Sequence, residues 1–265
     1  MKNGMYAILV CALLTGGVSC RKGDHTVNIF SVQDDIDLGK QLRDEILADP
    51  VQYPLLDRSQ YAGVYTYLEN VKQKILQSGQ VYYKDRFEWE LHVIRNDAEL
   101  NAFCAPGGYI FIYTGLLRYL RAEDQLAGVL GHEMAHADRR HSTDRLTQDY
   151  GIEVLLELVL GKNQNTLVQI ANSLRSLAYS RSQEKEADTY SVNYLCPTDY
   201  EADGAADFFE LLLADGQSCE GGAFFSTHPC PENRVANIHQ HKTEKACTGS
   251  QEYQAQYQAM VSLLP

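Results

Sequence analysis

The sequence lacks an excess of basic residues, paired CxxC cysteines and any apolar run long enough to cross a bilayer. Lysine and arginine total 23 against 35 aspartates and glutamates, a net charge of -12. Binding to phosphates needs a basic surface, so we expect no nucleic-acid partner. Without CxxC pairs, the seven cysteines do not match a structural zinc site. The chain also lacks internal repeats and low-complexity tracts, which excludes repeat and fibrous architectures.

The composition is that of a globular protein, with 45% hydrophobic and 22% charged residues over 265 positions. The first twenty residues stand apart. Lys2 precedes an apolar stretch over residues 5–14, and the sequence Gly-Val-Ser-Cys follows at residues 17–20. This order of a basic start, an apolar stretch and small residues is typical of a signal peptide.

The end of that segment resembles a bacterial lipoprotein cleavage site. It predicts that residues 1–19 are removed, that Cys20 becomes the lipidated N-terminus and that residues 20–33 form a polar tether. The protein would then be anchored on the periplasmic side of the cell envelope, at the outer membrane. The alternative is an ordinary secretion signal, with Cys20 incidental.

Hydrophobic periodicity predicts a mostly helical chain with a small sheet. Alternating residues predict a half-buried strand over residues 87–93, and a second strand over 109–113 follows a Pro-Gly-Gly turn. The chain after about Lys242 is polar and is expected to be loosely held. Helical spacing is found over residues 34–49, 59–78, 123–140 and 203–215, and over 143–195 with a break near 161–163.

The chemistry is concentrated in His132-Glu133-Met134-Ala135-His136. Residues four apart lie on one face of a helix, so both imidazoles can reach one metal ion. Glu133 is rotated away from them but can take a proton from the attacking water. The non-functional alternative is a helix with two surface histidines. It is disfavoured because the preceding residues 126–131 are small and apolar and are expected to be buried.

A catalytic zinc site needs a third protein ligand. A histidine six residues after His136 would serve, but that position is Ser142, so His141 either lies on the surface or supports the site from behind. A glutamate on a later helix is the other source. On a helix, Glu184 and Asp188 share a face whereas Glu186 points away. Glu184 is therefore the expected ligand, and Asp188 would hold a metal-binding histidine.

Several further motifs occur in a fixed order and resemble the HtpX and CAAX-prenyl-protease type of zinc metallopeptidase, in particular its soluble periplasmic branch typified by BepA and LoiP. The resemblance covers roughly residues 34–241. The motifs are Asn101-Ala102-Phe103, Pro106 to Ile110, Gly115-Leu116-Leu117, His132 to His136, Ser180-Arg181, Glu184-x-x-Ala187-Asp188, Thr227-His228-Pro229 and Arg234.

The resemblance implies a zincin-like α+β fold, mostly helical, with a small sheet whose edge strand flanks the metal helix. It implies one Zn²⁺ per chain and hydrolysis of misfolded or stalled envelope proteins. A metallopeptidase domain would occupy residues 34–241, followed by a polar tail over 242–265. The rival reading is a chaperone-like protein that binds extended peptides on the same fold and rarely cuts them; an intact Glu133 favours the enzyme.

The resemblance also implies roles for individual residues. Polypeptide substrates would add as a further strand beside the metal. His228 would either donate to the oxyanion or cap the site at rest, and Arg234 would hold its loop. The residues expected to form the substrate-binding edge are Asn101, Ala102, Phe103, Gly107 and Gly108.

The remaining cysteines allow disulfides in an oxidising compartment. We expect one or two bridges to pin the region around His228, with other pairings open. Cys104 is expected to act as a small buried apolar residue. The cysteines concerned are Cys196, Cys219, Cys230 and Cys247.

Overall fold

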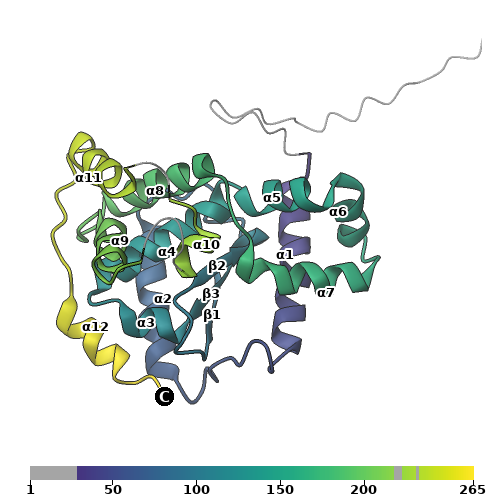
Figure 1. Cartoon of the computed structure of the whole chain (residues 1–265), viewed down its shortest axis with the longest axis horizontal. Coiled ribbons are helices and arrows are strands. Elements are labelled where there is room, and N and C mark those ends of the chain that lie inside the picture. The colour runs from purple at the N-terminus through teal and green to yellow at the C-terminus, as the bar shows by residue number, and fades with distance from the viewer. Residues whose placement is uncertain (1–28, 218–222, 231–232) are drawn as a thin grey trace, which may run out of the picture.

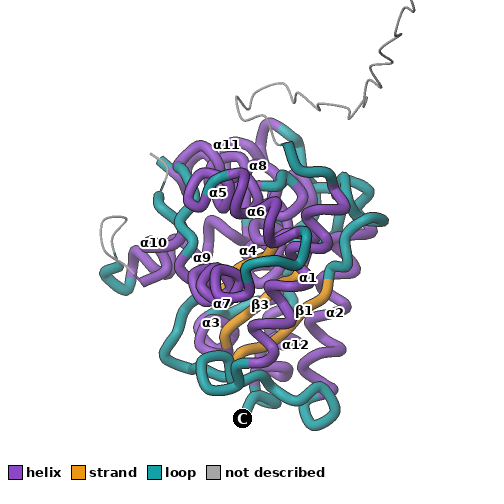
Figure 2. Tube along the Cα trace, turned by 90° about the vertical axis from the view of Figure 1, so that its right-hand side faces the viewer, coloured by secondary structure: helices purple, strands orange, loops and turns teal. Residues whose placement is uncertain are grey.

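A computed structural model describes residues 29–217, 223–230 and 233–265. Its centre is a three-stranded sheet of order β1-β3-β2. β3 (Tyr109–Tyr113) runs parallel to β1 (Glu90–Ile94) and antiparallel to β2 (Ala102–Ala105). β2 is therefore an edge strand. Figure 2 shows the three strands in orange, enclosed by helices.

The central strand supplies side chains to two separate cores. Ile110 and Ile112 point into one core, and Tyr109, Phe111 and Tyr113 point into the other. Successive strand residues face opposite sides of a sheet, which explains this division. Every residue of β3 is buried, because helices cover both faces. A strand with two covered faces reads as a continuous apolar run.

The larger core lies between one face of the sheet and most of the helices (Figure 1). Apolar residues at helical spacing drive these helices against the sheet and one another. The helices that contribute to this core are α2 (Ala62–Gln77), α3 (Thr114–Tyr119), α4 (Glu123–Asp138), α8 (Arg181–Leu195), α9 (Gly204–Ala214), α10 (Ala223–Thr227), α11 (Arg234–Glu244) and α12 (Gln254–Val261).

The smaller core covers the other face, where four helices pack on the aromatic side chains of the sheet. An ion pair between buried Asp35 and partly buried Arg140 joins the first of these helices to the turn between α4 and α5. A 3₁₀ turn (Leu174–Ser176) then leads out of this core toward α8. The four helices are α1 (Val32–Ala48), α5 (His141–Tyr150), α6 (Ile152–Val159) and α7 (Gln164–Ser173).

The α+β class, the small sheet and an edge strand beside the metal helix are confirmed. The hairpin break predicted near residues 161–163 is also confirmed, because α6 ends at Val159 and α7 begins at Gln164. The first strand begins later than predicted, at Glu90. It is buried rather than half-exposed, because both faces of the sheet are covered.

The expectation that the chain is loosely held after about Lys242 is wrong. A disulfide joins Cys247 to Cys196 at the end of α8. Helix α12 then buries Tyr257 and Met260 in the larger core. The few apolar residues in a polar stretch are what hold it, and a count of polar residues does not reveal them.

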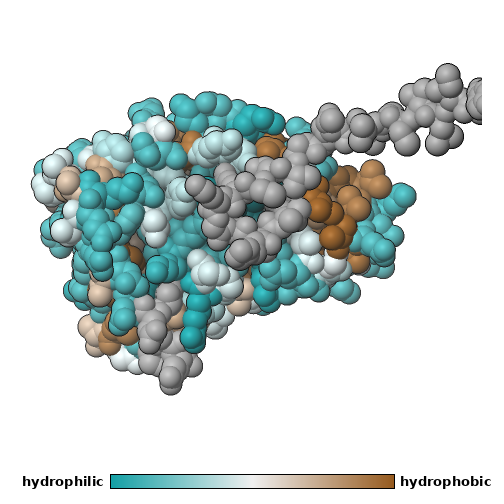
Figure 3. Space-filling view, turned by 90° about the horizontal axis from the view of Figure 1, so that it is seen from above, coloured by the Kyte–Doolittle hydropathy of each residue, from teal (hydrophilic) through white to brown (hydrophobic). Residues whose placement is uncertain are grey.

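Among the described residues, every helix is too short or too polar to cross a membrane. The hairpin formed by α6 and α7 nevertheless carries exposed apolar side chains. Ile152, Leu156 and Leu160 recur every four residues and are 42%, 44% and 68% exposed. The brown area at the right of Figure 3 lies over this hairpin.

Candidate metal centre

Helix α4 carries both histidines of the motif and is buried over all sixteen of its residues. Neighbouring helices can approach α4 closely because two of its positions are glycines. A Cβ at Gly128 would lie 2.2 Å from the backbone nitrogen of Ala205 on α9. A Cβ at Gly131 would lie 3.0 Å from Ser191 Oγ on α8. The small residues therefore bring α8 and α9 directly against the metal helix.

Four buried side chains converge between α4, α8 and the end of α10. Nε2 of His132 lies 3.1 Å from Nε2 of His136. The Glu184 carboxylate lies 3.4 Å from the first nitrogen and 3.3 Å from the second. With His228, these residues offer donor atoms that all lie within 4.8 Å of one another. The structure thus brings Glu184 to the two histidines and turns Glu186 away.

Glu133 is fully buried beside this cluster. Neither carboxylate oxygen has a hydrogen-bond partner within the described part of the chain. Nε2 of His228 lies 3.5 Å from Oε1 of Glu133. Burial raises the pKa of Glu133 above its ordinary value. An unpaired buried carboxylate is costly unless something else occupies the space that it faces.

Asp188 and Arg234 support the cluster from its other side. The Asp188 carboxylate lies 2.9 Å from Nδ1 of His132. Burial alone would lower the pKa of His132, but Glu184 and Asp188 outweigh it and raise that pKa to about 9. Arg234 donates to Asp188 at 2.7 Å and lies 3.0 Å from Glu184. One guanidinium thus offsets two buried carboxylates.

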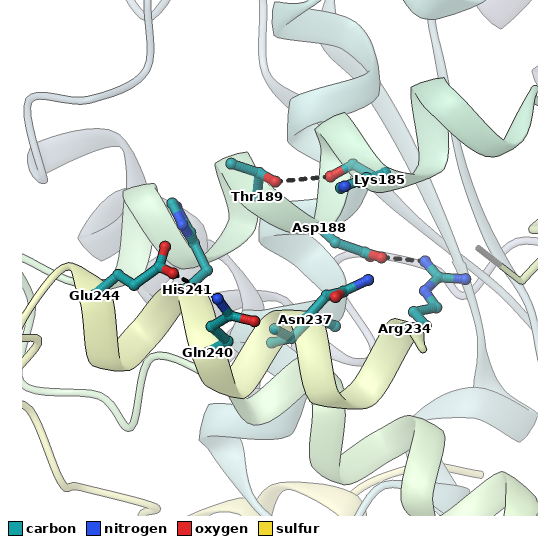
Figure 4. A pocket seen from close by; sticks show the side chains of 9 residues that line it. Lys185, Asp188, Thr189, Arg234, Asn237, Gln240, His241 and Glu244 are labelled. Carbon is teal, nitrogen blue, oxygen red and sulfur yellow. Dashed lines mark hydrogen bonds and ion pairs between the residues drawn. The ribbon is translucent and has the colours of Figure 1, made fainter. Parts of the chain in front are cut away.

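Arg234 is itself fixed by its surroundings. Its guanidinium lies over the ring of Phe209, and its Nη1 donates to the carbonyl of His228. Behind it, a polar pocket of about 180 Å³ lies between α8 and α11. Figure 4 shows Asp188 and Arg234 pointing toward each other at its edge. None of the four metal donors lines this pocket, so the metal cluster does not open into it.

His228 follows α10 and is held in place. Its ring stacks on Phe224 at 4.6 Å, and its Nδ1 lies 3.3 Å from Glu184. Cys230, two residues on, is disulfide-bonded. Of the one or two bridges predicted with their pairings open, one joins Cys196 to Cys247, while Cys219 lies outside the described residues. Cys104 is free and buried, as expected.

Residues 174–179 cover the cluster along the outer edge of β2. Asn101 on this edge donates its Nδ2–H to the carbonyl of Arg175. Ser142 donates to the carbonyl of Cys104 and shares a hydrogen bond with the hydroxyl of Tyr179. The Tyr179 ring stacks on His136 at 3.7 Å. In this conformation the edge strand and the metal donors are both covered.

Sequence reasoning did not identify Tyr179 as part of the site. The residue lies in an irregular stretch just before α8, where neither periodicity nor a motif points to it. Of the residues expected on the substrate edge, Ala102 and Phe103 lie on β2. Gly107 and Gly108 form the turn to β3 with φ values of 75° and 88°. Such values favour glycine.

Comparison with known proteins shows that the sequence is similar to peptidases. The model of Peptidase family M48 matches residues 65–242. The chain is 34% identical over 156 residues to the mitochondrial metalloendopeptidase OMA1 of Schizosaccharomyces pombe, covering 57% of this chain and 46% of that protein.

Two Escherichia coli proteins are also similar, both at 27% identity. The beta-barrel assembly-enhancing protease matches over 159 residues, 55% of this chain and 32% of its own length. The metalloprotease YcaL matches over 151 residues, 53% of this chain and 58% of its own. The matched part of this chain thus spans about a third to somewhat over half of these three relatives.

Proposed function

Because the chain belongs to peptidase family M48, we propose that it is a zinc-dependent metalloendopeptidase acting on proteins of the bacterial cell envelope. The observation that carries this proposal is Glu133. A buried carboxylate without a hydrogen-bond partner, set beside a cluster of metal donors, suits a general base awaiting a water molecule.

The donor set fits zinc. Two imidazoles and one carboxylate are a usual ligand set for catalytic zinc, which keeps a further position open. His132, His136 and Glu184 supply these three groups, and all are buried. When bound, zinc lowers the pKa of a coordinated water and polarises the scissile carbonyl.

The protein's own residues would then move and hold protons. Glu133 takes a proton from the attacking water and delivers it to the leaving amine. Asp188 accepts from Nδ1–H of His132 and so fixes its tautomer. Arg234 helps to keep Glu184 ionised, pairs with Asp188 and holds the His228 loop.

His228 has two proposed roles in two conformations. In the described conformation its position among the metal donors favours a cap that occupies the site at rest. Withdrawn from the donors, the same imidazole can donate to the oxyanion that develops during hydrolysis.

Substrates would bind in extended form beside Asn101, Ala102 and Phe103, as a strand added to β2. The outward-facing carbonyl of Cys104 is engaged by Ser142, and Asn101 is engaged by Arg175. Residues 174–179 must therefore move aside before a peptide can pair with this edge. Gly107 and Gly108 would shape the end of that edge.

The proposed location is the periplasmic side of the envelope, through a lipid on Cys20. The support is the sequence of residues 17–20 and the two Escherichia coli relatives. In a Gram-negative host, Cys20→Ser should leave the membrane fraction and lose the mobility shift of the lipidated form. Unchanged membrane association and mobility in that variant would contradict the anchor.

The proposal is tested by hydrolysis of unfolded β-casein. We expect cleavage that stops with a zinc chelator and returns when zinc is restored. Cleavage that is indifferent to the chelator would contradict a metal-dependent mechanism. Retention of casein peptides without any cleavage would instead favour the chaperone-like binding protein.

A further inference from the structure

His141 lies directly behind one of the metal donors. Its ring is fully buried at the start of α5. Its Nδ1 lies 3.1 Å from Nδ1 of His136, and its Nε2 lies 3.4 Å from a carboxylate oxygen of Glu186. Glu186 in turn accepts from Nε–H of Arg139 through its other oxygen. Four side chains thus form an unbroken row that ends at the metal cluster.

The direction of hydrogen bonding in this row follows from the position of His136. Its Nε2 faces the donor cluster, 3.3 Å from Glu184, so that nitrogen must be unprotonated to bind a metal. The proton of a neutral His136 then sits on Nδ1, which donates to Nδ1 of His141. An imidazole that accepts at Nδ1 carries its own proton on Nε2. That N–H faces Glu186, which can only accept when ionised.

Helix α8 also supports the other metal histidine, His132, through one side chain instead of two. Asp188 reaches Nδ1 of His132 directly at 2.9 Å. Glu186 lies on another face of α8 and contacts His141, whose other ring nitrogen faces His136. The imidazole of His141 thus links Glu186 to His136. The two carboxylates that follow Glu184 therefore support one metal histidine each.

We propose that His141 is a positioning residue for the metal, which fixes the tautomer and orientation of His136 and is itself oriented by Glu186. The inference rests on the proposed metal site. It is tested by zinc affinity rather than by hydrolysis. If the wild-type protein does not bind zinc, the proposed function fails. If it binds zinc and substitutions of His141 and Glu186 leave the zinc affinity unchanged, only the role proposed for His141 fails.

The first test compares His141→Phe with His141→Asn. Phenylalanine fills the space but accepts no hydrogen bond, whereas the Oδ1 of asparagine can stand where Nδ1 was. Loss of a group behind a metal histidine typically costs 10- to 100-fold in affinity. By competition with a chelator of known affinity, we expect a loss of about that size for His141→Phe and of about threefold or less for His141→Asn.

A purely structural role predicts a different outcome. The two variants would then weaken zinc binding equally, in proportion to the stability that they lose in the zinc-free protein. Thermal unfolding of both zinc-free forms supplies that comparison. Wild-type affinity in His141→Phe, or equal losses in the two variants, would overturn the proposal.

The second test uses Glu186 and can be carried out even if His141→Phe does not fold. Glu186→Gln keeps an acceptor for Nε2–H of His141 and should bind zinc within about threefold of wild type. Glu186→Leu removes the acceptor. His141 can then carry its proton on Nδ1, where it no longer accepts from His136, and we expect zinc affinity to fall about tenfold. Lys185→Leu, the exposed neighbour on α8, is the control and should change nothing.

Combining His141→Phe with Glu186→Leu tests whether Glu186 acts through His141 or supports the metal site independently. If Glu186 acts through His141, the double variant should bind zinc no more weakly than His141→Phe alone. Additive losses would show that Glu186 acts on the metal site by another route and would contradict the proposed row.

Discussion

Helices α4 and α6 differ in a way that their compositions do not predict. α4 contains glutamates, aspartates and histidines, yet all of its residues are buried. α6 is mostly apolar, with six apolar residues among its eight, yet only Leu155 and Leu158 are buried and Leu156 is 44% exposed. Most polar groups of α4 tolerate burial because neighbouring segments supply partners, as Tyr194 does for Asp138 and Asp188 for His132. Within the described residues, Glu133 and Asp124 are exceptions, with no hydrogen-bond partner for their carboxylate oxygens. Apolar residues are exposed on α6 because the hairpin packs on the domain along one side.

Glu184→Gln tests the partners of α4 and should have the largest effect. It replaces a charged donor by a neutral one, so we expect zinc content to fall from about one per chain to nearly none, with loss of hydrolysis. Elemental analysis of the purified variant measures this. Glu186→Gln is the matched control and should keep its zinc; the reverse pattern would overturn the ligand assignment.

Gly128→Val tests the close approach of α4 to α9. The added Cβ would lie 2.2 Å from the backbone nitrogen of Ala205, so the helices must separate. We expect the free energy of unfolding in urea to fall by more than about 4 kcal/mol, or folding to fail. Valine placed at the exposed Glu157 of α6 should change it by less than about 0.5 kcal/mol. Comparable effects at the two positions would erase the contrast between the helices.

Removing the disulfide tests the support that the C-terminal segment gives to α4. The backbone N–H of Glu123, the first residue of α4, donates to the carbonyl of Glu252, five residues after the bridge. Cys196→Ser with Cys247→Ser should cost about 2–4 kcal/mol, because the bridge closes a loop of 51 residues. Hydrogen exchange should quicken in α12 and remain unchanged in α6. Equal quickening in both helices would argue against a local role.

A matched pair within α6 compares a buried with an exposed position, and the exposed position should show the smallest effect. Leu155→Ala empties a fully buried position and should cost about 2–4 kcal/mol. Leu156→Ala, one residue away on the exposed side, should cost no more than about 0.5 kcal/mol. Denaturant unfolding of the zinc-free protein measures both, and a large loss at Leu156 would mean that this face is covered in solution.

Sequence reasoning was sufficient to place residues that lie one or two turns apart on the same helix. His132 and His136 lie one helical turn apart, and the choice of Glu184 over Glu186 followed from the angle between residues on a helix. Long periodic helices were located for the same reason. These inferences depend on local geometry, which a sequence contains.

Contacts between distant segments were beyond sequence reasoning. Tyr179 reaches His136 across 43 positions from an irregular stretch with no periodic pattern. The C-terminal segment looked loose because a disulfide and two buried side chains hold it, and neither leaves a periodic trace. His141 was left between two alternatives, because its spacing excludes one kind of site without revealing what the ring contacts.

The central claim is that Glu133 acts as the base beside a metal that other residues hold. The direct measurement is zinc content and casein hydrolysis on one preparation of Glu133→Gln. We predict about one zinc per chain, as in the wild type, with hydrolysis slowed by a factor on the order of a thousand or more. Full zinc with undiminished hydrolysis, or loss of zinc together with hydrolysis, would contradict it.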